Sequence, residues 1–173
     1  PPIANRLGHL DWPAPTVDEH AAFMMRGDLQ ADRKVMNYSN EEARVMAAWP
    51  EAWSKSVGSE IAFLGRFKHH KNKMPKQDDP KVGRAWPSDR SWEAATRADA
   101  VAKIHGLSDI DHETFVGAFI SPGVAGEWFH WREEQDMPDA AAVLDGKEKF
   151  THESKRLDRT VGLFASCAAL VTP

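Results

Sequence analysis

The centre of the chain carries the stretch Trp86-Pro87-Ser88-Asp89-Arg90-Ser91-Trp92-Glu93. Pro87 stops whatever element precedes it, because its ring restricts Ala85-Trp86 to extended backbone. Ser88 or Asp89 can then cap a new helix by accepting a hydrogen bond from a free backbone N–H. Apolar residues recur at helical spacing beyond this point, which predicts a helix from about Asp89 to His105. Arg90 falls in its first turn, where free N–H groups and the helix dipole favour an anion.

The guanidinium of Arg90 has two interpretations at this stage. Its planar, permanently charged fork is well suited to phosphate, and a helix start is where a phosphate is readily bound. The alternative is an ordinary first-turn arginine, paired with Asp89 or Glu93 beside it. The spacing alone does not separate the two.

Composition limits the class of protein. The chain has 173 residues, enough for one domain, and its 42% hydrophobic and 28% charged residues are typical of a folded protein. The net charge of −4 argues against broad nucleic-acid binding. The single cysteine, Cys167, excludes an internal disulfide and indicates a reducing cytoplasm. No apolar run approaches the roughly 18 residues of a membrane-spanning helix, and no signal peptide opens the chain.

Capping residues and apolar spacing predict helices along most of the chain. They are expected at about 16–26, 39–53 with a break or bend at Pro50, 58–68, 113–120, 123–131, 140–144 and 153–170. Residues 7–12 alternate like one short strand, which cannot pair alone and is expected to come from a sheet in a larger protein. The predicted fold is therefore mainly α, a multi-helix bundle preceded by one short strand.

Two apolar patterns predict the packing. Trp92, Trp128 and Trp131 each lie on an apolar helix face and are expected in one core. In the last helix, 3.6-residue spacing predicts a packed face made of Leu157, Val161, Phe164, Cys167 or Ala168, and Val171. Cys167 on that face is expected to be an inert core thiol.

Other constellations give weak signals. Glu127-x-x-His130 has the spacing of di-metal helical bundles, but the second pair that such a site requires is missing. His69 and His70 could bind zinc with His105 or His112, although no cysteine partner or His-x3-His pair supports this. His9 is expected to be a packing histidine. The basic run 71–76 lies in a long polar loop and is either solvated or a phosphate or nucleic-acid contact. The sequence contains no GxxxxGK[ST] or GxSxG motif, so no complete active site is evident.

Several segments, in order along the chain, together resemble one family. Ile3-Ala4-Asn5-Arg6-Leu7-Gly8-His9-Leu10 resembles a segment of MoxR-like and dynein-related AAA+ ATPases that joins the nucleotide-binding core to its last strand. The central stretch resembles their lid signature F-P-T-P-R-S-W-E, with Asp89 where the family often has proline. Phe115-Val116-Gly117 to Phe129, and Asp136-Met137-Pro138-Asp139, resemble later segments of the lid.

The resemblance implies a division and two functional residues. Residues 1–15 would be the end of the AAA+ core, and 16–173 the helical lid domain. Arg6 matches the arginine finger, which acts in trans on the γ-phosphate bound by a neighbouring subunit. Arg90 matches the lid arginine called sensor 2, which contacts the nucleotide phosphate within its own subunit. The phosphate loop and the residues that hold magnesium would lie N-terminal to Pro1.

The resemblance therefore implies nucleotide sensing and ring assembly, coupled to ATP hydrolysis with Mg in the full-length parent, a MoxR-like chaperone or remodelling protein. The ring would be a homo-oligomer, a hexamer in the family, in the cytoplasm and acting on a protein partner or substrate. This chain alone would be inactive and would bind no cofactor tightly. The alternative is a free-standing helical interaction module, whose tryptophans anchor a partner and in which Arg6 and Arg90 are structural.

Overall fold

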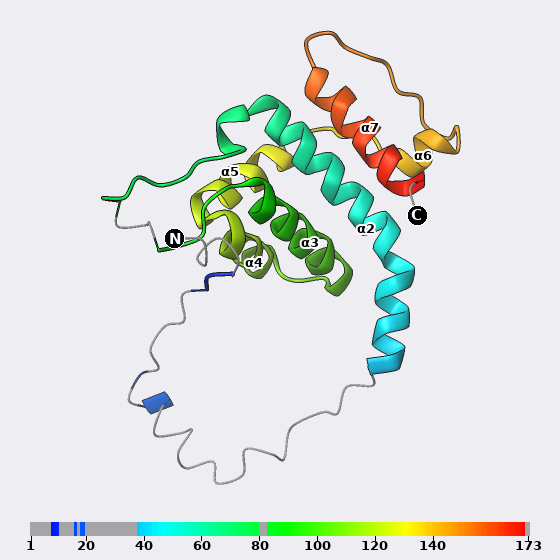
Figure 1. Ribbon diagram of the computed structural model, residues 1–173. Coiled ribbons are helices and arrows are strands. Elements are labelled where there is room, and N and C mark those ends of the chain that lie inside the picture. Colours follow the sequence, from blue (N-terminus) through cyan, green and yellow to red (C-terminus); the bar gives the residue numbers. More distant parts are fainter. Residues whose placement is uncertain (1–7, 11–15, 17, 20–37, 80–82, 172–173) are drawn as a thin grey trace.

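The computed structural model describes residues 8–10, 16, 18–19, 38–79 and 83–171. Within these residues the regular elements are all helices, which confirms the mainly α fold. They are α2 (Tyr38–Arg66), the short 3-10 helix η2 (Lys68–His70), α3 (Asp89–His105), α4 (Asp109–Ile120), α5 (Pro122–Glu133), α6 (Ala140–Leu144) and α7 (Leu157–Val171). The long helix α2 runs between α3–α5 on one side and α6–α7 on the other (Figure 1). None of the described helices is both long and apolar enough to cross a membrane.

Helix α2 corrects the prediction of two helices, one ending near Trp53 with a break or bend at Pro50 and one starting at Gly58. It continues through Pro50 and Gly58 as one helix of 29 residues. Proline leaves the carbonyl four residues before it without a partner. Pro50 and Met46 are both exposed, so water can reach that carbonyl and the helix continues. The expected break at Pro50 was therefore wrong.

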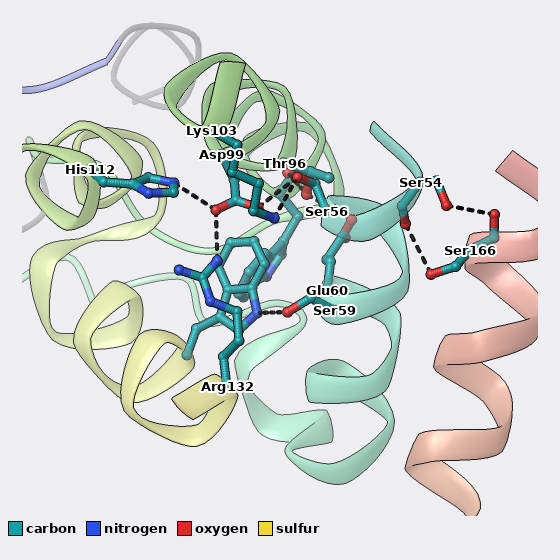
Figure 2. Close-up of polar contacts among 12 residues, drawn as sticks. Ser54, Ser56, Ser59, Glu60, Thr96, Asp99, Lys103, His112, Arg132 and Ser166 are labelled. Carbon is teal, nitrogen blue, oxygen red and sulfur yellow. Dashed lines mark hydrogen bonds and ion pairs between the residues drawn. The ribbon is translucent and has the colours of Figure 1, made fainter. Parts of the chain in front are cut away.

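Gly58 packs against α7 instead of starting a new helix. A Cβ built on Gly58 would lie 1.8 Å from Ser166 Oγ and 2.8 Å from the carbonyl oxygen of Gly162 on α7. A Cβ on Gly162 would in turn lie 2.7 Å from the Cβ of Ala62. The two helices therefore approach each other at a pair of glycines. Next to this contact, Ser54 Oγ donates to the Ser166 carbonyl at 2.9 Å, and Ser166 Oγ donates to the Ser54 carbonyl at 3.0 Å (Figure 2).

Helix α3 confirms the central prediction at both ends. It spans Asp89–His105, with Ser88 as its N-cap. Its C-cap is Gly106, at a φ of 62° in the left-handed region that glycine tolerates. Helix α4 begins at Asp109, four residues before the predicted Glu113, because the side chain of Ser108 caps it.

An aromatic core joins α2, α3 and α5. Trp92, Trp128 and Trp131 are buried in one cluster with Phe63 from α2, as predicted. The Trp92 and Trp128 rings meet edge to face, with centroids 5.4 Å apart. Each of these two indole N–H groups has a partner: Trp92 Nε1 donates to the His70 carbonyl at 2.9 Å, and Trp128 Nε1 donates to Ser59 Oγ at 3.0 Å. These contacts fix the end of α2 and η2 against the rest of the bundle.

Helix α7 packs through a different face from the one predicted. It begins at Leu157 rather than near Glu153. Its buried residues are Thr160, Gly162, Leu163 and Ser166. The predicted apolar face is exposed, with Leu157 at 60%, Phe164 at 68% and Val171 at 70%. The close backbone approach at Gly162 requires small residues at the contact, so the larger apolar residues lie on the other side. Cys167 is half-buried rather than part of the core.

The N-terminal predictions are only partly covered. Residues 8–10 of the expected strand form neither strand nor helix, and the His9 N–H donates to the Ala118 carbonyl of α4 at 2.7 Å. The remaining residues of that strand lie outside the described residues. The capping box Thr16–Glu19 is present, because Glu19 Oε2 accepts from the Thr16 N–H at 2.7 Å and the Glu19 N–H donates back to Thr16 Oγ1 at 3.3 Å. The body of the helix expected at 16–26 lies outside the described residues.

Candidate functional site

Arg90 lies in the first turn of α3, in a rigidly capped helix start. The Ser88 N–H donates to Ser91 Oγ at 2.7 Å, and the Ser91 N–H donates to Ser88 Oγ at 3.2 Å. Ser91 Oγ also donates to the Trp86 carbonyl at 2.8 Å, which ties the preceding segment to the helix. Both serines are buried, whereas Arg90 is exposed. The helix start is therefore ordered while its arginine faces solvent.

The two acidic neighbours of Arg90 have other partners. Asp89 lies 3.6 Å from Lys71 Nζ, and Glu93 accepts from Arg97 at 3.0 Å, one turn further along α3. Arg90 makes no ion pair with any residue of the described part of the chain. In the structure, Arg90 is therefore not paired with Asp89 or Glu93. Its guanidinium is available to a ligand.

A cleft lies beside this helix start. It has a volume of about 640 Å³ and lies between the 73–87 segment and the junction of α4 with α5. Its lining includes three cations and two carboxylates: Lys73, Lys76, Arg84, Asp79 and Glu127. Trp86 and Pro87, which lead into α3, also line it, but Arg90 does not. Lys73 and Lys76 of the basic run 71–76 line this cleft, and both are exposed.

His9 and Ser121 also line this cleft. His9 is half-buried and reaches the lining from the N-terminal segment. Ser121 connects α4 to α5 with a φ of 83°, an uncommon value for a residue with a side chain. This residue turns the chain directly into Pro122, the first residue of α5, so the start of α5 lies in the cleft wall.

A second polar constellation lies inside the bundle, around Asp99 of α3 (Figure 2). Asp99 is fully buried. One oxygen, Oδ1, accepts from His112 Nε2 at 2.7 Å and from Arg132 at 2.8 Å. The other, Oδ2, accepts from Lys103 Nζ at 2.5 Å and from Ser56 Oγ at 2.6 Å. The carboxylate therefore links α2, α3, α4 and α5.

The electrostatics of this cluster indicate a structural role. Burial alone would raise the pKa of Asp99, but the hydrogen bond from His112 and the charges of Lys103 and Arg132 outweigh it and hold this pKa well below its usual range. Lys103 and Arg132 also line a cavity of about 390 Å³ with Lys55. Lys103 and Arg132 share the single charge of Asp99, and Lys55 pairs with Glu51 and Asp139, so each cation of this cavity already has an acidic partner.

A third constellation joins η2 to α5. His70 is 1% exposed, and its Nε2 lies 2.8 Å from Oε2 of Glu127, which is mostly exposed. The exposed His69 ring lies beside His70, with the two ring centroids 4.0 Å apart. Burial lowers the pKa of His70, although the hydrogen bond to Glu127 opposes this effect. The His70 ring is therefore mainly neutral near pH 7 and donates its Nε2 proton to the carboxylate.

The two metal-ligand groupings considered from the sequence are not formed. His112 belongs to the Asp99 cluster, and His105 lies 3.5 Å from Glu41, so neither joins His69 and His70. His130 points to Glu134, at 3.5 Å, rather than sharing a site with Glu127. Instead, His69 and His70 from the first grouping lie close to Glu127 from the second.

Arg6, the other predicted site residue, lies outside the described residues. The structure therefore places one of the two predicted arginines. The Asp99 cluster was missed by the sequence analysis, although Asp99 and Lys103 stand four residues apart on α3, the spacing of a helical ion pair. No pattern in the sequence indicates the partners of Asp99 on the other helices.

Comparisons with protein-family models, curated proteins and solved structures found no match to this chain.

Proposed function

We propose that this chain is the C-terminal lid portion of an AAA+ ATPase, in which Arg90 binds a nucleotide phosphate. The observation that carries the proposal is the exposed Arg90 without an intramolecular ion pair among the described residues, in the first turn of a helix capped by Ser88. The first-turn N–H groups and the helix dipole favour a negative ligand at this position. The sequence resemblance supplies the class of ligand, a nucleotide triphosphate with Mg.

Arg6 completes the proposal as an arginine finger. It would act across a subunit boundary in a homo-oligomeric ring and stabilise the charge that develops on the transferred phosphoryl group. The chaperone or remodelling role, a protein substrate and the cytoplasmic location belong to the same proposal. Since the chain contains no phosphate-loop motif, ATP hydrolysis requires a phosphate loop from elsewhere in the full-length protein.

The test of Arg90 compares two arginines of α3 in the full-length protein. Arg90→Ala is expected to weaken nucleotide binding and to lower ATP turnover, because the arginine contacts phosphate in cis. Arg97→Ala is the matched control: Arg97 lies two turns further along the same exposed helix surface and already pairs with Glu93. Equal effects of the two substitutions, or normal ATP binding and turnover in Arg90→Ala, would contradict the proposal.

Arg6 requires a different test because it would act in trans. Arg6→Ala should spare ATP binding and reduce turnover by a factor on the order of 10³, as for other arginine fingers. Mixing this variant with a subunit disabled in its phosphate loop should restore partial activity at those interfaces that combine an intact finger with an intact loop. Normal turnover by Arg6→Ala alone, with no activity gained on mixing, would show that Arg6 is structural.

The exposed apolar surface of α7 favours a second candidate function, a helical protein-interaction module. Leu157, Val161, Phe164 and Val171 form a stripe along its solvent side. In this alternative the stripe binds a partner and Arg90 has no ligand. Phe164→Ser would then abolish partner capture and Arg90→Ala would leave it unchanged, in a protein that shows no ATP turnover.

A further inference from the structure

We infer that His69, His70 and Glu127 form a binding site for a divalent transition metal, with Zn²⁺ as the best-suited ion. Each of the three offers one ligand atom, and these atoms all lie within 4.8 Å of one another. Two imidazoles and one carboxylate are a donor set that binds zinc in proteins and leaves a fourth position open. This inference does not depend on the proposed nucleotide function.

The surrounding fold holds His70 in place before any metal arrives. The His70 ring stacks on Phe63, with centroids 5.6 Å apart and planes 14° from parallel. The His70 N–H donates to the Phe67 carbonyl at 2.9 Å, and the His70 carbonyl accepts from the buried indole of Trp92. A metal ligand that is already fixed loses little conformational freedom on binding. His70 is therefore the anchor of the site.

The hydrogen-bond pattern of His70 is compatible with a change from proton to metal. Its Nε2–H now donates to Glu127, while its buried Nδ1 has no hydrogen-bond partner within the described residues. When a metal binds Nε2, the ring proton moves to Nδ1 and the imidazole stays neutral. Nδ1 has no acceptor among the described residues, so the metal bonds must outweigh the cost of the buried, unpaired Nδ1–H. The metal then takes the place of the proton between His70 and Glu127.

The other two ligands lie where a metal can reach them from solvent. Glu127 and His69 are both exposed, and Glu127 also lines the 640 Å³ cleft. Remaining coordination positions can therefore be filled by water. Lys73 is near enough to oppose positive charge at His70, but its side chain is exposed and can move away. The site combines one rigid buried ligand with two accessible ones.

Zinc titration of the full chain by calorimetry, without nucleotide, tests the inference. Wild-type protein is expected to bind one Zn²⁺ per chain. Glu127→Gln and His69→Ala should each weaken binding by more than about 100-fold, since losing an outer-shell partner alone costs about 10–100-fold. Both changes are at exposed residues, and the amide introduced by Glu127→Gln keeps an oxygen that can accept the His70 hydrogen bond, so the fold should be preserved. His70 is left intact because its replacement would disturb the core.

His130→Ala is the matched control, since His130 lies on the same helix, is exposed and pairs only with Glu134 among the described residues. This variant should bind zinc as tightly as wild type. Replacing zinc by Co²⁺ should give the visible absorption of a low-coordinate nitrogen and oxygen site, and Glu127→Gln should remove it. Absence of binding, binding that survives both ligand substitutions, or equal loss in His130→Ala would each overturn the inference.

Discussion

Replacing Asp99 with asparagine is expected to lower the free energy of unfolding by about 3–5 kcal/mol at neutral pH, the usual cost of removing one partner from a buried ion pair. The fully buried carboxylate accepts four hydrogen bonds, from His112, Arg132, Lys103 and Ser56. Asparagine has nearly the same shape, but its amide nitrogen must face two of these donors. A hydrogen bond to a charged group contributes about 1.5–3 kcal/mol, so losing two gives a similar range.

Partial exposure of the cations moderates this cost. The Lys103 and Arg132 side chains are 27% and 26% exposed, so water can solvate them in part when the carboxylate charge is removed. If both cations were fully buried, losing two strong hydrogen bonds would cost up to about 6 kcal/mol, so that value is too high here. Urea unfolding, monitored by tryptophan fluorescence, measures the difference. Asp145→Asn is the control, because this exposed carboxylate pairs with Lys147 at the surface and should change stability by less than about 0.5 kcal/mol.

The pH dependence gives a second measurement of the same effect. The folded-state pKa of Asp99 is lowered, so its ionisation stabilises the fold above the unfolded-state pKa of about 3.9. As the pH falls below this value the unfolded chain takes up a proton before the folded chain does, and the stabilisation is lost. The difference between wild type and Asp99→Asn should therefore be constant from pH 7 to about 5 and shrink below about 4. A loss under about 1 kcal/mol, or a difference independent of pH, would refute the reasoning.

Three other predictions concern packing. Trp128→Ala should cost about 3–5 kcal/mol in urea unfolding, because the ring is fully buried; a loss below about 1 kcal/mol would contradict this burial. Gly162→Ala should lower stability by about 1–3 kcal/mol through overpacking against Ala62, whereas Gly123→Ala, with open space around its Cβ, should be neutral or stabilising. Gly106→Ala should lower Tm, because its φ of 62° strains a residue with a Cβ, and an unchanged Tm in thermal denaturation would contradict that geometry.

Local signals predicted the helix ends that depend on neighbours in the sequence. Ser88 and Gly106 bound α3 as expected, because capping and a left-handed C-cap involve residues within one turn. The prediction of α2 was wrong at Pro50 and Gly58, because neighbours in the sequence do not determine the effect of these residues. Their effect depends on exposure and on a helix about a hundred residues further along the chain, neither of which is encoded locally.

The packed face of α7 shows the same limit. Periodicity identified its apolar stripe at Leu157, Val161 and Phe164, but the stripe is exposed because the glycine contact with α2 requires small residues. Site prediction had a similar outcome: Arg90 is placed by its own helix start, whereas His70 and Glu127 are 57 residues apart and meet only through the tertiary fold. The fold class was predictable from the sequence, and the contacts between distant helices were not.

The length of α2 has a mechanical consequence. A helix of 29 residues is a rod about 44 Å long, and it contacts both α3 and α7 (Figure 1). A tilt of about 5° about one end of such a rod displaces the other end by roughly 4 Å. The reciprocal bonds between Ser54 and Ser166 prevent α7 from sliding along it. The α7 contacts at Ser54 and Gly58 lie within about 18 Å of the C-terminal end of α2 at Arg66, so the same tilt about that end would shift them by less than about 2 Å.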